Sequence, residues 1–180
     1  YNLVFMELNR SADGSLQRVL LDGKASVPAL QEDYAFLAAG LIALYDETDE
    51  PRWLARAREL TDAMLQRFRD PAGGGLFMAE ASGETPTMAR PKDVADGPLP
   101  AGNAVALDVL VKLASRTGER EYRAEAEALV GAFAAQVQRE PAAFPQLLIA
   151  VERLRHGEAG DRQHAAGGAV RAEARLTRVD

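Results

Sequence analysis

The sequence predicts an all-α protein made of stacked helical hairpins, and two observations support this fold class. Residues 31–68 are echoed 69 positions later by residues 100–137, and the echo matches large apolar side chains along most of its length. The matching pairs are Leu41 and Leu110, Leu44 and Leu113, Trp53 and Tyr122, Leu60 and Leu129, Met64 and Phe133, and Phe68 and Val137. In each copy these residues recur at helical spacing on both sides of a polar turn. One hairpin cannot bury its own apolar face, so repeated hairpins are expected to stack.

The composition is that of a soluble globular protein, because 47% of the 180 residues are hydrophobic and 27% are charged. The formal net charge of -6 argues against nucleic-acid and anionic-membrane partners, since both favour clustered Lys and Arg. The chain holds no cysteine, which excludes thiol chemistry, and no apolar stretch long enough to cross a membrane. We expect a cytoplasmic protein with no nucleic-acid or membrane partner, no cofactor and no metal.

A small β-hairpin is the first element expected along the chain. Asp22-Gly23 separates residues 16–20 from residues 24–27, and a two-residue turn of this kind joins antiparallel strands. The chain opens with Tyr1 and not with Met, so we expect a fragment or a processed product.

The first helical hairpin is expected to pair an inner helix near residues 32–47 with an outer helix that ends at Phe68. The inner helix is apolar nearly all round, whereas the outer helix carries one apolar stripe opposed by charged residues. Trp53 lies on that stripe, so core packing is its expected role. Thr48 and Asp49 are suited to capping, and Pro51 fits a first helical turn.

The second hairpin is expected to contain an inner helix near residues 101–116 and an outer helix over residues 122–137, with Gly118 as the stop signal between them. A third inner helix is expected near residues 145–155. Residues 1–156 then form one partial helical domain. The tail, residues 157–180, is rich in Gly, Ala and charge, and we expect it to be poorly ordered or weakly helical.

The connection between the two hairpins is unusually long, at roughly 30 residues, and loops of that length are usually functional or disordered. It carries Gly73-Gly74-Gly75, which lacks the setting and the Lys of a phosphate loop. A second small β-hairpin is expected here between residues 75–78 and 87–89.

An ordered set of short motifs runs along the chain. The motifs are Gln31-Glu32-Asp33-Tyr34-Ala35-Phe36-Leu37, Pro51-Arg52-Trp53-Leu54, Gly73-Gly74-Gly75-Leu76-Phe77, Arg90-Pro91-Lys92, Asp96-Gly97 and Pro100-Ala101-Gly102-Asn103. This set resembles the C-terminal part of the thioredoxin domain-containing proteins whose second domain is an (α/α)6 toroid of six hairpins. Ala101 stands where that family has Ser in its Pro-Ser-Gly-Asn motif. The resemblance covers roughly residues 13–154 and implies an incomplete toroid with short β-hairpins in its loops, related in fold to N-acylglucosamine 2-epimerases and six-hairpin glycosidases.

The repeat geometry itself places a candidate site. Inner helices of a ring run the same way, so the loops that precede them share one rim. Carboxylates there would suit acid/base work on a sugar, and Asp33 and Asp96 are the catalytic candidates. The candidate substrate-binding residues are Glu32, Tyr34, Arg90, Lys92, Asn103 and Gln146.

Several candidates also have a structural interpretation, whereas Asp96 is expected in a loop where neither helix nor core demands it. Asp33 and Asn103 suit helix capping, and Arg90 and Lys92 suit ion pairs with Asp93 or Asp96 on a wet surface. Two classes of function therefore stay open. One is a toroid that binds or acts on a carbohydrate; the other is a non-catalytic helical scaffold that docks a thioredoxin-like domain or another protein. The sequence leaves open whether the parent is an enzyme, and we expect this part alone to be inactive. Exposed inner-helix surface predicts self-association.

Overall fold

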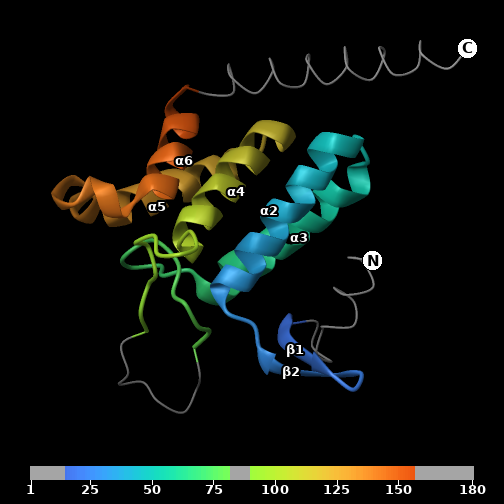
Figure 1. Ribbon diagram of the computed structural model, residues 1–180. Coiled ribbons are helices and arrows are strands. Elements are labelled where there is room, and N and C mark those ends of the chain that lie inside the picture. Colours follow the sequence, from blue (N-terminus) through green and yellow to red (C-terminus); the bar gives the residue numbers. More distant parts are fainter. Residues whose placement is uncertain (1–14, 82–89, 157–180) are drawn as a thin grey trace, which may run out of the picture.

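The computed structural model describes residues 15–81 and 90–156, and these residues are mostly helical (Figure 1). The predicted strand at residues 87–89 and the tail at residues 157–180 lie outside the described residues. The three inner helices are confirmed within two residues of their expected bounds. In chain order the elements are β1 (Gln17–Leu21), β2 (Lys24–Pro28), α2 (Gln31–Thr48), α3 (Pro51–Phe68), α4 (Gly102–Thr117), α5 (Arg120–Arg139), the 3-10 helix η1 (Pro141–Ala143) and α6 (Pro145–His156).

The first β-hairpin forms as expected, with β1 antiparallel to β2 and Leu21 paired with Lys24. Its turn places Asp22 at a φ of 49° and Gly23 at 73°, the left-handed pair that two-residue hairpins favour. Residues 75–78 form no strand in the described part of the chain. Leu76 instead makes an isolated antiparallel bridge with Arg69, at the end of α3.

The helix ends follow the sequence signals. Asp49 closes α2 in the left-handed conformation, and Pro51 occupies the first turn of α3. Gly118 closes α4 with a φ of 75°, where a residue with a side chain would be strained.

The three inner helices run in the same direction. The N-terminal ends of α2 and α4 are joined by Gln31, whose Nε2 donates to the carbonyl oxygen of Gly102 at 3.1 Å. Their C-terminal ends are joined by an ion pair between Asp46 and Arg116, at 2.7 Å. Because both ends match, α2 and α4 are parallel. Asp96 joins the N-terminal ends of α4 and α6 in the same way.

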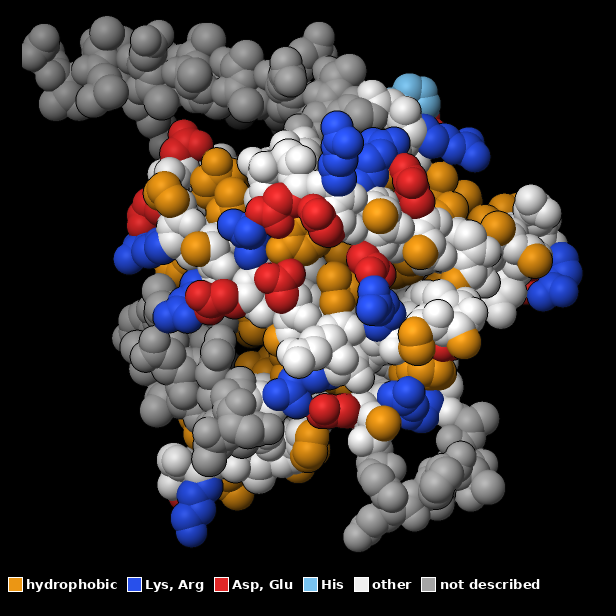
Figure 2. Space-filling model, turned by 180° about the vertical axis from the view of Figure 1, so that it is seen from behind, with side chains coloured by type: hydrophobic (Ala, Val, Ile, Leu, Met, Phe, Trp, Pro, Cys, Tyr) orange, Lys and Arg blue, Asp and Glu red, His pale blue; other side chains and the backbone are white. Residues whose placement is uncertain are grey.

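The outer helices α3 and α5 lie behind this inner layer in Figure 1. They contact each other through polar side chains, since the Tyr122 hydroxyl donates to Asp62 Oδ1 at 2.8 Å and Arg58 pairs with Glu119. Seen from behind, the surface mixes acidic and basic side chains (Figure 2). The two helices expected to be outer therefore lie on one side of the layer formed by α2, α4 and α6.

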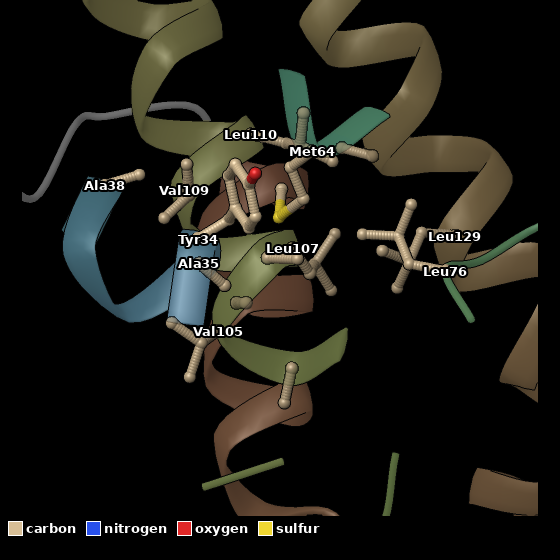
Figure 3. Close-up of a cluster of buried hydrophobic side chains, with 14 of the residues drawn as sticks. Tyr34, Ala35, Ala38, Met64, Leu76, Val105, Leu107, Val109, Leu110 and Leu129 are labelled. Atoms are coloured by element: carbon tan, nitrogen blue, oxygen red, sulfur yellow. The ribbon is translucent and has the colours of Figure 1, made fainter. Parts of the chain in front are cut away.

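The core forms between the inner and outer helices, and α4 is its centre (Figure 3). Every residue from Ala101 to Val111 is buried, because α2 and α6 flank α4 while α3 and α5 cover its back. Each large apolar side chain buried in this way contributes roughly 1.5–3 kcal/mol. Trp53 packs against this core from α3, as the sequence predicted.

Candidate functional site at the N-terminal rim

The candidate residues gather at one end of the helical layer, where the loops enter α2, α4 and α6. We call this end the rim and define it as residues 30–34, 90–103 and 144–146. The β1–β2 hairpin and the long connection lie at the same end in Figure 1. A Cβ atom added to Gly102 would lie only 3.1 Å from Glu32 Cβ, so two of the entering segments touch.

Asp33 and Glu32 lie in the first turn of α2. Asp33 Oδ2 accepts a hydrogen bond from the backbone N–H of Leu30 at 2.8 Å, which is the capping interaction expected of an acid at this position. Arg18 of β1 pairs with both carboxylates, at 3.0 Å from Asp33 Oδ2. The Glu32 side chain stays 35% exposed, so it is the more accessible of the two.

Tyr34 is a buried residue of this rim segment. It is 3% exposed, its ring packs edge-on against Phe68 at 5.5 Å between centroids, and its hydroxyl accepts the backbone N–H of Leu16 at 2.9 Å. These contacts tie the β-hairpin to α2.

Asp96 bridges two inner helices. Its Oδ1 accepts the backbone N–H of Ala101 at 2.8 Å, and its Oδ2 accepts the backbone N–H of Gln146 at 2.8 Å. Ala101 precedes α4 and Gln146 lies in the first turn of α6, so one carboxylate satisfies free amides at both helix starts. Gln146 thus takes part through its backbone.

Asn103 corrects a sequence-based interpretation, because it does not cap α4. The residue at the N-cap is Ala101, and Asn103 lies inside the helix with no exposed surface. Its Oδ1 accepts the N–H of Leu76 at 2.8 Å, while Nδ2 donates to the carbonyls of Leu76 and Asp93 at 2.9 and 2.7 Å. A buried side-chain amide can both accept from and donate to the backbone of a neighbouring segment. Here the Asn103 amide fixes the long connection onto α4.

Arg90 and Lys92 flank one aromatic ring. The Arg90 guanidinium lies 3.8 Å from the centroid of Phe77, and Lys92 Nζ lies 5.0 Å from it. Lys92 also donates to Asp70 Oδ2 at 2.7 Å and to the carbonyl of Gly74 at 2.5 Å. The expected ion pair of Lys92 with Asp93 or Asp96 was therefore wrong, because the acid that Lys92 contacts is Asp70.

That contact has an electrostatic consequence. The hydrogen bond from Lys92, supported by the backbone N–H groups of Gly73 and Ala72, lowers the pKa of Asp70 to about 2. Asp70 therefore stays ionised at any physiological pH and holds the Gly-rich turn against the loop.

The comparisons with known proteins agree with part of the sequence-based interpretation. The chain is 38% identical to spermatogenesis-associated protein 20 of Mus musculus over 117 residues, which is 65% of this chain and 15% of that protein. The Homo sapiens spermatogenesis-associated protein 20 is 36% identical over 120 residues, 67% of this chain and 15% of that protein. An uncharacterised Caenorhabditis elegans protein is 27% identical over 151 residues, 84% of this chain.

The chain spans about 15% of the length of the spermatogenesis-associated protein 20 sequences it matches and 20% of the C. elegans protein. No protein-family model matches it. What the whole protein binds or catalyses is therefore a matter of proposal.

Two buried polar residues were missed by the sequence analysis. Gln31 is 1% exposed and bonds to Gly102, and Asp108 is 6% exposed between Lys112, at 3.0 Å, and Arg153 of α6. The sequence held a signal for Asp108, which is a lone polar residue inside an otherwise apolar stretch of helix and so needs a buried partner. Gln31 gave no such signal, because Glu32 and Asp33 follow it at the start of α2.

The described residues contain no group of three or more His, Asp or Glu placed to hold a metal ion. Within residues 15–81 and 90–156, no helix is long and apolar enough to cross a membrane. The catalytic and binding roles of the rim residues stay predictions, and their observed contacts are those of groups that fasten helices and loops together.

Proposed function

We propose that this chain is a scaffold segment, which stacks helical hairpins inside a longer protein and presents their outer surface for docking. The observation that supports this best is the use of Asp96: both of its oxygens accept backbone N–H groups, and they belong to the starts of two different helices. A carboxylate used in this way fixes helix positions. A general acid or base instead needs an oxygen free for the substrate proton.

The similarity to spermatogenesis-associated protein 20, together with the motif resemblance to thioredoxin domain-containing toroids, supports a place for this chain in the C-terminal part of such a protein. In that setting its hairpins extend an incomplete (α/α)6 ring, and its partner is the thioredoxin-like domain of the same parent. The cytoplasmic location is proposed with it.

The scaffold role is tested by comparing two neighbouring loop carboxylates. Asp96→Ala removes the bridge between α4 and α6, whereas Asp93→Ala removes an acid whose contact with Asn103 is made by its backbone carbonyl. We expect Asp96→Ala to lower the melting temperature clearly and Asp93→Ala to change it little. Equal melting temperatures would contradict the scaffold role of Asp96.

A carbohydrate site is the second candidate, and it is favoured by the shared direction of the three inner helices. That direction brings the entering segments to one rim, where Glu32 lies beside the first residue of α4. Here Asp33 and Asp96 would supply acid/base chemistry, while Arg90, Lys92 and the rim amides would orient a polyhydroxylated ligand.

Calorimetric titration with a panel of monosaccharides and disaccharides separates the two candidates. Under the carbohydrate proposal, Glu32→Gln and Asp33→Asn weaken binding several-fold while the melting temperature changes little. If no sugar binds, and if Asp33→Asn destabilises the chain, the scaffold role is favoured. Self-association through exposed apolar helix surface is a further proposal, which light scattering over a range of concentrations tests directly.

A further inference from the structure

An apolar groove of about 640 Å³ lies between α5 and α6. Leu148 and Ile149 of α6 line it, and they remain 38% and 48% exposed. From α5 it is lined by Val130, Ala134 and Val137. Aliphatic side chains gathered in a concave surface of this size favour a covering partner.

The preceding repeat shows what covers the equivalent position. There, α5 packs on its own inner helix α4, and side chains at its N-terminal end reach the outer helix of the hairpin before it, α3. Tyr122 and Glu119 make the polar contacts to α3, through Asp62 and Arg58. In this repeat the outer helix α5 thus covers its own inner helix and is joined to the preceding outer helix by polar side chains. In the described part of the chain, α6 is an inner helix that has no outer helix after it.

The sequence of the tail carries the spacing of an outer helix. In α3 and in α5, four buried or partly buried residues recur at positions i, i+4, i+7 and i+11, with Ala at the second place. The sequence of the tail repeats this spacing, again with Ala at the second place. The first residue of its stripe comes 20 residues after Pro145, the first residue of α6. In the same way, the stripe of α5 begins 20 residues after Gly102, the first residue of α4. The three stripes are Trp53, Ala57, Leu60 and Met64; Tyr122, Ala126, Leu129 and Phe133; and Ala165, Ala169, Ala172 and Leu176.

Charge complementarity supports the same register. The Arg58–Glu119 pair joins α3 to the residue before α5. In the next repeat, Glu127 is the residue equivalent to Arg58, and Arg162 is the residue equivalent to Glu119. The two charges are reversed, so the pair stays attractive. The Glu127 side chain is 57% exposed on α5, where it pairs with Arg123 one turn away.

We propose that residues 165–180 of this chain bind the α5–α6 groove as the outer helix of the third hairpin, with Arg162 facing Glu127. Ala165, Ala169, Ala172 and Leu176 face the groove, and the arginines between them face the solvent. Gly167 and Gly168 each lower helix propensity by about 1 kcal/mol relative to Ala, so this helix depends on the groove for its stability.

The two isoleucines of the chain allow a direct test on the full-length chain. Ile149 lines the groove, whereas Ile42 is completely buried in the core and reports whether the fold is intact. Both δ1-methyl groups are followed by NMR, together with their accessibility to a soluble paramagnetic probe. Leu176→Glu places a charge on the stripe, and Ala174→Glu places the same charge on the opposite face as the matched control.

We expect Leu176→Glu to shift the Ile149 methyl signal and to raise its accessibility at least two-fold, while Ala174→Glu leaves both unchanged and Ile42 is unaffected in either variant. An Ile149 methyl that is fully accessible in the unmodified chain, or equal in both variants, overturns the proposal. A dependence of the Ile149 signal on protein concentration also overturns it, because the groove would then be covered by a second copy.

Charge reversal tests the register separately. Glu127→Arg and Arg162→Glu should each raise the accessibility of the Ile149 methyl group, and the double variant should restore the protection of the unmodified chain. Single variants that have no effect, or a double variant that shows no recovery, would overturn the register with Arg162 facing Glu127.

Discussion

Gln31 and Gly102 hold the first two inner helices together at the rim, although 71 positions separate them in the sequence. Gln31 Nε2 donates to the carbonyl oxygen of Gly102 at 3.1 Å, and Gln31 is 1% exposed. A Cβ on Gly102 would lie 2.3 Å from Gln31 Oε1 and 3.1 Å from Glu32 Cβ. Glycine is therefore required here by the close approach of α2 and α4.

Replacing this glycine should loosen the inner layer. We expect Gly102→Ala to lower the free energy of unfolding by about 1–3 kcal/mol, because the added methyl group must displace a buried, bonded side chain. Gly40→Ala is the matched control: Gly40 lies within α2 with no atom near its missing Cβ, so this substitution should stabilise by about 0.5–1 kcal/mol. Urea denaturation measures both. A stable Gly102→Ala variant would show that the helices can separate at little cost.

Asn103 should be the most sensitive polar residue of the rim. Asn103→Leu leaves the N–H and carbonyl of Leu76 buried without their partner, and we expect a loss of about 2–4 kcal/mol. Asn103→Asp keeps the Oδ1 acceptor but replaces the Nδ2 donor with a second oxygen, which then faces two carbonyl oxygens. We therefore expect this variant to lose at least as much free energy of unfolding. Thermal unfolding and hydrogen exchange at the Leu76 amide check this. Rapid exchange at that amide is the expected local signature of Asn103→Leu, which removes the acceptor of the Leu76 N–H.

The sequence predicted the helices well because their signals are local and repeated. The apolar spacing from Trp53 to Phe68 recurs from Tyr122 to Val137, and Pro51 and Gly118 mark helix ends by their backbone preferences. Such patterns need no knowledge of which helix lies beside which. The shared direction of the inner helices followed from the repeat, and the contacts at both ends of α2 and α4 agree with it.

The contacts at the rim could not be read in the same way. Asn103 has the side chain of a good N-cap, but the helix starts one residue earlier and the amide turns to Leu76, far away in sequence. Lys92 had two acids within four positions, yet it pairs with Asp70, which the turn at Gly74 and Gly75 brings beside it. Both choices depend on how the long connection folds over α4, which local spacing does not encode.

The Lys92–Asp70 contact predicts an acid dependence of stability. The pKa of Asp70 is lowered from 3.8 to about 2 in the folded chain, so its contribution is complete above pH 3.8 and is lost as the pH falls through about 2. The melting temperature of the unmodified chain should exceed that of Asp70→Asn near neutral pH, and the difference should shrink toward pH 2. In a Lys92→Met background most of this difference should already be absent. A difference that is independent of pH would contradict the ion pair.

Tyr122 predicts the opposite, alkaline dependence. Burial, together with the hydrogen bond that its hydroxyl donates to Asp62 Oδ1 at 2.8 Å, raises its pKa from 10.0 to about 12. A raised pKa means that the contribution of Tyr122 to stability is complete below pH 10.0 and is lost as the pH rises through about 12, so α3 and α5 should separate in that range.

The chain has four tyrosines, and the tyrosinate absorbance of the unmodified chain minus that of Tyr122→Phe isolates the signal of Tyr122. We expect the difference to rise near pH 12 and the melting temperature of the unmodified chain to fall over the same range, with a smaller fall in Tyr122→Phe. Asp62→Asn should move the Tyr122 step only part of the way back toward pH 10.0, because burial is the larger cause. A step already complete near pH 10.0 in the unmodified chain would show that Tyr122 is open to water and that the contact between the outer helices is absent in solution.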